Sequence, residues 1–201
     1  MDSYQTLAAP ASARLTRERS RFLAIVEPTT HDQAAERIDA LRRQYHDATH
    51  VCSAYRCRRN LSVASHADDA GEPRGSAGTP ILLALEGAQL LDVLAVVVRY
   101  FGGVKLGIGG LVRAYSDATA AALAQARIIE RSVETTLRIA FPHETNAGVM
   151  RAVHSHGARV LEIRYDTQGH ATVALSPSRV EAFTDAVREE TGARATLEKV
   201  P

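Results

Sequence analysis

Two glycine-rich stretches carry most of the residues whose chemistry could serve a function. The first, Ser65 to Pro80 (SHADDAGEPRGSAGTP), combines the carboxylates of Asp68, Asp69 and Glu72 with three glycines, the last of them Gly78. Several glycines in one loop indicate backbone conformations that other residues rarely adopt. Two interpretations are open: a rigid loop that presents carboxylates to a cation, a basic partner or a substrate, or carboxylates that cap backbone N–H groups and hold the loop against the next helix.

The second stretch, Arg99 to Tyr115 (RYFGGVKLGIGGLVRAY), follows an apolar segment and leads into a predicted helix. Its glycines leave backbone N–H groups free at a helix start, which is a natural site for an anion. The candidate residues for binding an anion or nucleic acid are Arg99, Gly102, Gly103, Lys105, Gly107, Gly109, Gly110 and Arg113. The spacing matches neither a dinucleotide-binding fingerprint nor a Walker A loop. The alternative is a tight strand-to-helix crossover in which glycines permit close packing.

His50 and Cys52 lie two apart on a predicted strand and therefore share a face. A Cys–His pair suits nucleophilic catalysis or metal binding, but the sequence indicates no third group that would orient the pair. We therefore expect packing partners, assign no catalytic residue, and predict no metal and no cofactor. Cys57 lies five positions from Cys52, on the opposite face, so both should be reduced thiols without an intrastrand disulfide.

Apolar patterns predict the elements that position these residues in the first part of the chain. Strands are predicted at Arg21–Val26, Val51–Cys57 and Asp92–Tyr100, and helices at Thr30–Tyr45, Ile81–Glu86 and Leu111–Arg127. The strand Asp92–Tyr100 is the most apolar and should be central and buried on both faces. The segment Asn60–Gly78 is either a long ordered loop or a short strand followed by a loop.

Two helix starts are predicted from local signals. Thr30 with Gln33 three positions later is the pattern of a capping box. Thr79 followed by Pro80 predicts a helix that begins there with the threonine as its cap.

After Ser132 the pattern changes to a second unit. Strand, helix, strand, strand, helix and strand are predicted in that order, at Val133–Phe141, Glu144–His156, Arg159–Tyr165, Ala171–Leu175, Ser178–Thr191 and Ala195–Val200. This βαββαβ order is that of a ferredoxin-like domain. The sequence therefore predicts an α+β protein with two domains, residues 1–130 and 131–201.

Bulk composition narrows the possible environments. The formal net charge of +1 favours neither binding nor exclusion of nucleic acid, because net charge says nothing about its distribution. No stretch approaches the roughly 18 apolar residues that span a bilayer, and residues 1–12 lack the features of a secretory signal. We expect a cytoplasmic protein without a membrane partner.

Three segments together resemble the Impact/YigZ family. They are His50 to Ala54 (HVCSA), Asp69 to Pro80 (DAGEPRGSAGTP) and Val97 to Tyr115 (VVRYFGGVKLGIGGLVRAY), within a match from Ser20 to about Leu123. The resemblance implies a first domain with the fold of the second domain of ribosomal protein S-five, and a ferredoxin-like second domain similar to domains of elongation factor G. The common pattern is closer to Asp-Gly-Glu-Pro, so Asp68 or Asp69 is the family's aspartate, and Ala70 and Arg74 depart from it.

The resemblance also implies a role. Eukaryotic relatives regulate translation by competing for the activator of a kinase, whereas bacterial members are associated with binding of nucleic acid or ribosomes. We therefore expect a translation-linked binding protein that engages RNA, the ribosome or a translation-associated protein through the glycine-rich face. Two alternatives are a hydrolase or phosphoryl-handling enzyme that uses Asp69 and Glu72 with His50 or Cys52, and a protein–protein adaptor that binds no RNA. A binding role is favoured over an enzyme.

Overall fold

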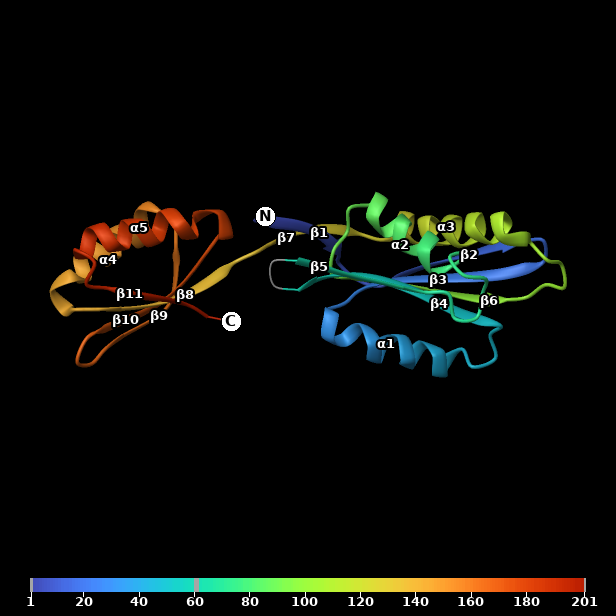
Figure 1. Ribbon diagram of the computed structural model, residues 1–201, viewed down its shortest axis with the longest axis horizontal. Helices are drawn as coiled ribbons and strands as arrows, with labels where there is room; N and C mark the ends of the chain where they lie inside the picture. Colours follow the sequence, from blue (N-terminus) through green and yellow to red (C-terminus); the bar gives the residue numbers. More distant parts are fainter. Residues whose placement is uncertain (1, 60–61, 201) are drawn as a thin grey trace. The chain divides into compact units, whose positions relative to one another are not determined.

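The chain folds into two units in a computed structural model that describes residues 2–59 and 62–200 (Figure 1). One unit comprises residues 5–130, and the other comprises residues 2–4 together with residues 131–200. Strands β1 (Ser3–Leu7) and β7 (Ile128–Ser132) pair as a small two-stranded sheet. The predicted α+β class is confirmed.

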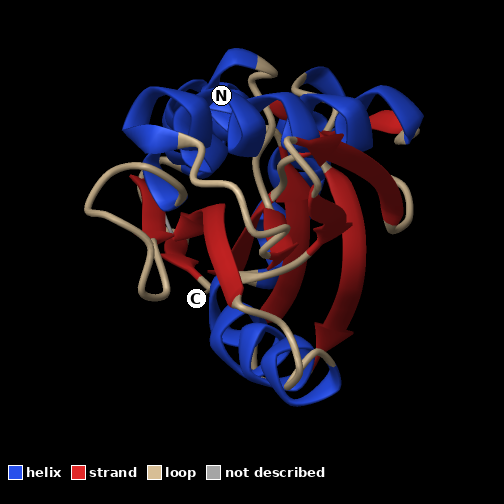
Figure 2. Cartoon of the chain, turned by 90° about the vertical axis from the view of Figure 1, so that its right-hand side faces the viewer, coloured by secondary structure: helices blue, strands red, loops and turns tan. Residues whose placement is uncertain are grey.

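A five-stranded antiparallel sheet forms the centre of the N-terminal unit. Its strands, in spatial order, are β2 (Ala11–Arg17), β3 (Ser20–Pro28), β6 (Val93–Tyr100), β4 (His50–Arg59) and β5 (Ser62–Asp68). Helix α1 (His31–Gln44) covers one face, while α2 (Gly78–Gly87) and α3 (Gly107–Gln125) cover the other. In Figure 2 the helix below the strands is α1.

Strand β6 explains why two cores form around one sheet. Alternate residues face α2 and α3 in one apolar cluster, namely Val93, Ala95 and Val97. The intervening residues face α1 in the other, namely Leu94, Val96 and Val98. All six side chains are inaccessible to solvent, as expected for a strand that is apolar along both faces. The prediction that this strand is central and buried on both faces is confirmed.

Several predicted boundaries and caps were wrong. Strands β1 and β2 were not predicted, because their polar and apolar residues mix without a long apolar run. Residues Ser62–Asp68 form a strand, so the second interpretation of the segment Asn60–Gly78 is correct, although residues 60 and 61 lie outside the described residues. Helix α1 does begin after Thr30, but the threonine side chain makes no capping hydrogen bond.

The starts of α2 and α3 lie earlier than predicted. Ala77, and not Thr79, is the N-terminal cap of α2, so the expected threonine cap is absent. Helix α3 begins at Gly107 instead of Leu111, so the second glycine-rich stretch is divided between a loop and the first turns of a helix. Glycine is a poor helix former, which is why the sequence pattern hid this start.

The C-terminal unit has the predicted βαββαβ order. Its antiparallel sheet has the order β11 (Thr196–Lys199), β8 (Thr135–Phe141), β10 (Gly169–Leu175) and β9 (Arg159–Tyr165). Helices α4 (Asn146–Ser155) and α5 (Val180–Thr191), preceded by the short turns His143–Thr145 and Pro177–Arg179, lie on one face (Figure 1). A separate core that includes Ile139, Phe141, Val149, Val173 and Phe183 joins the helices to the sheet.

Candidate functional site

The pairing of β4 with β6 gathers the predicted site residues at one end of the N-terminal sheet. His50 at the start of β4 lies directly opposite Arg99 near the end of β6. A cavity of about 380 Å³ opens beside them, lined by Thr49, His50, Glu72, Pro73, Arg99, Phe101, Lys105, Leu106, Gly107, Ile108 and Leu111. Residues from both glycine-rich stretches and from the signature strand therefore line one cavity.

A buried hydrogen-bond network surrounds the carboxylate of Glu72. Its Oε1 accepts from Arg99 Nη1 at 2.6 Å and from Tyr115 Oη at 2.7 Å. The side chains of Glu72 and Arg99 are only 3% and 6% exposed. Charge-assisted bonds of this kind offset the cost of removing both ions from water. The ion pair joins the first glycine-rich stretch to β6.

Arg99 is consequently not a free cation. Its guanidinium lies 5.6 Å from the ring centres of both Phe22 and Phe101, and its Nη2 lies 3.5 Å from Ser20 Oγ. Only its Nε is buried without a hydrogen-bond partner. The sequence named Arg99 as a candidate for binding a phosphate. Because Glu72 already neutralises its charge, Arg99 is a weaker candidate than the sequence alone indicated.

His50 has its orientation fixed by the acidic loop. Its Nδ1 lies 2.9 Å from the carbonyl oxygen of Ala70. Because a carbonyl can only accept, Nδ1 carries the proton and donates it. The other ring nitrogen, Nε2, lies 3.9 Å from Glu72 Oε2. The imidazole is partly exposed in the cavity wall, where it can meet a ligand.

Cys52 lies beneath the cavity in an environment that suppresses thiolate chemistry. Its Sγ donates to the Asp69 carbonyl oxygen at 3.0 Å and lies 3.3 Å from Tyr115 Oη. Burial, reinforced by the charge of Glu72, raises the pKa of the Cys52 thiol to about 12. Burial also raises the pKa of Tyr115. A thiol that stays protonated is a poor nucleophile, so this geometry does not support the Cys–His alternative.

Both cysteines are free and buried, and burial also raises the pKa of the Cys57 thiol to about 12. We expect the native protein to resist iodoacetamide at pH 8, because the thiolate fraction is small and access is blocked. Mass spectrometry should detect alkylation of both residues only after denaturant is added. Rapid modification of Cys52 in the native protein would contradict the described environment.

Asp69 organises the acidic loop. Its Oδ2 accepts from the backbone N–H of Gly75 at 2.7 Å, and its Oδ1 accepts from Ala77 at 3.0 Å and Gly78 at 2.8 Å. Burial acts to raise the pKa of Asp69, but these three backbone donors outweigh it and hold the pKa below its usual value. The contacts correspond to the capping interpretation, since Ala77 and Gly78 begin helix α2.

Asp68 has a related role. Its Oδ1 accepts from the backbone N–H of Ala70 at 2.9 Å, and its Oδ2 forms an ion pair with Arg42 of α1. The Ala70 hydrogen bond, with Arg42, keeps the pKa of Asp68 below its usual value despite partial burial. Neither Asp68 nor Asp69 lines the cavity.

Two of the glycines are needed for close packing. A Cβ on Gly102 would lie 2.0 Å from the carbonyl carbon of Arg19 in the β2–β3 hairpin, and one on Gly78 would lie 2.5 Å from the backbone nitrogen of Asp68. Gly103 lies in the loop, and Gly109 and Gly110 lie in the first turns of α3. These contacts support the crossover interpretation for part of the stretch, while Gly107 lines the cavity.

Positive charge is left at the cavity by Lys105. It is exposed, and no ion pair links it to the residues that the structure describes. Arg113 is also exposed, but it lies further along α3 and does not line the cavity. Phe101 and Ile108 stand at the cavity with 47% and 65% of their surface exposed.

These apolar residues were missed by sequence reasoning, which attended to charge and glycine. The available signal was that each of these large apolar residues is next to a glycine in the sequence, a position with no regular apolar pattern. Tyr115, whose hydroxyl completes the Glu72 network, gave no such signal because it lies on the buried face of a helix.

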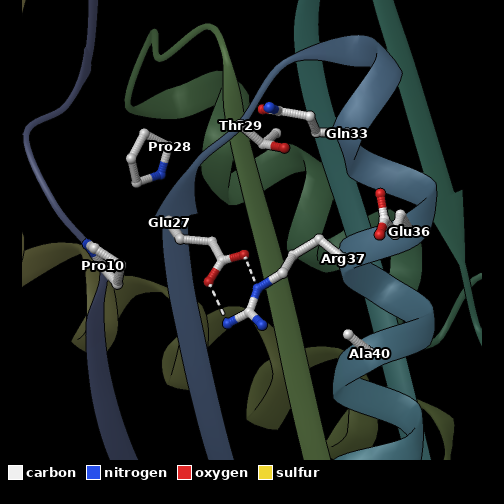
Figure 3. A pocket seen from close by; sticks show the side chains of 8 residues that line it. All are labelled: Pro10, Glu27, Pro28, Thr29, Gln33, Glu36, Arg37 and Ala40. Atoms are coloured by element: carbon white, nitrogen blue, oxygen red, sulfur yellow. Dashed lines mark hydrogen bonds and ion pairs between the residues drawn. The ribbon is translucent and has the colours of Figure 1, made fainter.

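A larger hollow of about 510 Å³ lies between β3 and α1 (Figure 3). Its central charges already neutralise one another, because Arg37 donates to both carboxylate oxygens of Glu27 at 2.6 and 3.0 Å. Among residues 2–59 and 62–200, no three His, Cys, Asp or Glu side chains are grouped to hold a metal ion. No described helix is long and apolar enough to cross a membrane.

The fold and the cavity define an α+β protein whose N-terminal unit has a partly apolar cavity bordered by the start of helix α3. The Impact N-terminal domain matches residues 18–123, and the chain belongs to the Impact family. It is 30% identical over 200 residues to the IMPACT family member YvyE of Bacillus subtilis (strain 168), covering 99% of this chain and 92% of that protein.

Two further comparisons extend this result. An IMPACT family member from the pol 5′ region of Thermus thermophilus is 44% identical over 140 residues, covering 68% of this chain and 75% of the relative. A crystal structure of a hypothetical protein is similar over 100% of this chain and 98% of its own, with a TM-score of 0.70 and 27% identity.

Proposed function

We propose that this protein is a translation-linked binding protein whose N-terminal cavity engages single-stranded RNA. The observation that carries the proposal is the convergence of Lys105, the amino end of α3 and the exposed ring of Phe101 on one cavity of about 380 Å³. The link to translation is supported by membership of the Impact family, whose eukaryotic relatives regulate translation.

The chemistry of these groups suits a nucleotide. Backbone N–H groups at the amino end of a helix favour a phosphate, and Lys105 adds an exposed cation beside them. An exposed aromatic ring such as Phe101 provides a platform on which an unpaired base stacks. Recognition of this kind reads backbone and base stacking more than sequence.

Catalysis receives less support from the same site. The carboxylates named for an enzyme have internal partners, because Asp69 accepts from three backbone N–H groups and Glu72 is paired with Arg99. The Cys52 thiol stays protonated at neutral pH, with a pKa of about 12. These groups hold the site together and leave His50 as the titratable side chain of the signature strand that faces the cavity.

A protein partner is the second candidate, and exposed apolar side chains favour it. Val104 and Ile108, 38% and 65% exposed, flank Lys105. Large apolar groups exposed in this way suit a protein interface. A ribosome pelleting assay separates the candidates: RNA binding is lost after nuclease treatment, whereas binding to a protein survives it.

Lys105→Glu tests the RNA proposal directly. We expect it to weaken binding of a fluorescent single-stranded RNA about tenfold and to reduce the slope of log affinity against log salt by about 1, because one phosphate contact is lost. Lys105 and Lys199 are the two lysines of the chain, and Lys199 is exposed on β11, so Lys199→Glu is a matched control that should bind normally.

Fluorescence anisotropy across 50 to 200 mM salt measures both quantities. An affinity that stays constant over that range would overturn the RNA proposal, because phosphate contacts release counterions. Equal losses of RNA affinity from Lys105→Glu and Lys199→Glu would indicate a general effect of charge. They would contradict the proposal that RNA binds at the cavity.

A further inference from the structure

Strand β9 is an exposed, apolar end strand in the C-terminal unit. It pairs with β10 along one edge, and no strand among the described residues pairs with the other. Each of its seven residues is exposed. Its large apolar side chains, Val160, Leu161, Ile163 and Tyr165, are between 38% and 54% exposed.

The other end strands of the four- and five-stranded sheets are protected in ways that β9 is not. Strand β11 has only four residues. Strand β5 is mainly polar or small and exposes one large apolar residue, Val63. Strand β2 has one large apolar residue, Leu15, which is partly buried against the core. An open edge with apolar side chains and no proline offers unpaired backbone groups to another strand.

The regular part of β9 is long enough to pair. A register shift separates Val160 from Glu162, but residues Glu162–Tyr165 remain in unbroken register with β10. The irregularity therefore lies in the amino-terminal half of the strand, and the pairing around Ile163 is regular.

We propose that β9 is a self-association edge, at which two copies of this chain pair antiparallel and join their four-stranded sheets into one. The unpaired backbone groups of β9 can bond to another strand. Glu162 and Arg164 lie on either side of Ile163, so a second copy of β9 running antiparallel offers complementary charges.

Symmetry restricts the possible registers. A two-fold axis perpendicular to the joined sheet preserves its faces, so each residue opposes one whose side chain points to the same side. An axis at Glu162 would oppose two glutamates, and an axis at Arg164 would oppose two arginines. An axis at Ile163 instead opposes Glu162 to Arg164 of the second copy, twice, and places the two isoleucines side by side.

The side chains already have the orientation that this register needs. Arg164 Nε lies 3.1 Å from Glu162 Oε1 within the chain, with both side chains more than half exposed. They therefore share one face of the strand and can exchange partners with the second copy. Opposite charges on directly opposed residues stabilise a strand pair, and like charges destabilise it.

Sedimentation velocity over a range of protein concentrations tests this proposal with the full chain. We expect a concentration-dependent dimer for the natural sequence. Ile163→Lys should raise the dissociation constant of this dimer at least tenfold, because a charge at the centre of an edge strand opposes pairing. Val63→Lys is the matched control, because Val63 is an exposed apolar residue of β5, an end strand of the N-terminal sheet. It should leave the dissociation constant of the dimer unchanged.

Charge exchange supplies a test that does not depend on Ile163→Lys folding. Glu162→Arg alone should weaken the dimer, and Glu162→Arg with Arg164→Glu should restore it, because opposed charges are again complementary. A protein that is monomeric at every concentration would overturn the proposal, as would a dimer that none of the β9 changes affects. Failure here would leave the RNA site untouched, because the two lie in different units.

Discussion

Replacing Glu72 with alanine is expected to destabilise the N-terminal unit by about 3–5 kcal/mol, the usual cost of removing one partner of a buried ion pair. The carboxylate accepts from Arg99 at 2.6 Å and from Tyr115 at 2.7 Å. Without it, the Arg99 guanidinium would keep only its 3.5 Å contact with Ser20 Oγ and no opposite charge, and the Tyr115 hydroxyl would lose its acceptor, so both groups would be buried without adequate compensation.

Chemical denaturation followed by circular dichroism measures the loss. The chain has no tryptophan, and two units need not unfold together, so hydrogen exchange of peptides from β4, β6 and α3 should localise the change. Glu36→Ala, at an exposed position of α1, is the control and should change stability by less than about 0.5 kcal/mol. A loss below about 1 kcal/mol for Glu72→Ala would contradict the described network.

A double substitution distinguishes the contribution of the two charges to stability from the contribution of side-chain volume. Because replacing a buried pair with apolar residues is often neutral, Glu72→Leu combined with Arg99→Met should recover much of the stability that either single change loses. Non-additivity of this size is expected for groups in direct contact. If the two losses simply add, the residues act independently and the ion pair does not organise the cavity.

Much of the fold could be predicted from the sequence because it rests on local patterns. The continuous apolar run of β6 indicated a strand buried on both faces, and alternating patterns after Ser132 gave the βαββαβ order. The failures occurred where no such pattern exists. Helix α3 begins within glycines, and the first backbone N–H groups of α2, those of Ala77 and Gly78, donate to Asp69, which lies eight positions before Ala77. Local sequence propensity cannot reveal a capping contact that forms only when a distant part of the loop folds back onto the helix start.

The candidate site could be predicted in part for the same reason. His50 and Arg99 belong to segments that were both singled out, but their position opposite one another depends on the pairing of β4 with β6. Arg99 was expected to be a free cation, because sequence cannot reveal that Glu72, 27 positions earlier, neutralises it. Lys105 was named as a candidate for anion binding; it is exposed and lines the cavity, and its binding role stays a prediction.

Replacing Asp69 with alanine is expected to cost about 2–3 kcal/mol at neutral pH, since three backbone N–H groups lose a charged acceptor and the start of α2 loses its cap. The folded-state pKa of Asp69 lies below its usual value, because donors from Gly75, Gly78 and Ala77 outweigh the effect of burial. A carboxyl group with a lowered pKa stabilises the folded state above its unfolded pKa of about 3.9, and this contribution is lost as the pH falls through the lower folded value.

The difference in unfolding free energy between the natural chain and Asp69→Ala should therefore be constant near neutrality and shrink below about pH 4. Denaturant titrations at a series of pH values measure that difference, and Asp32→Ala, whose side chain is 98% exposed, should show no comparable loss. A difference that persists undiminished in acid would mean that the charge of Asp69 is not what orders the loop. If it does diminish, the acidic loop is a pH-dependent support for the cavity wall formed by Glu72 and Pro73, so ligand binding should weaken over the same acidic range.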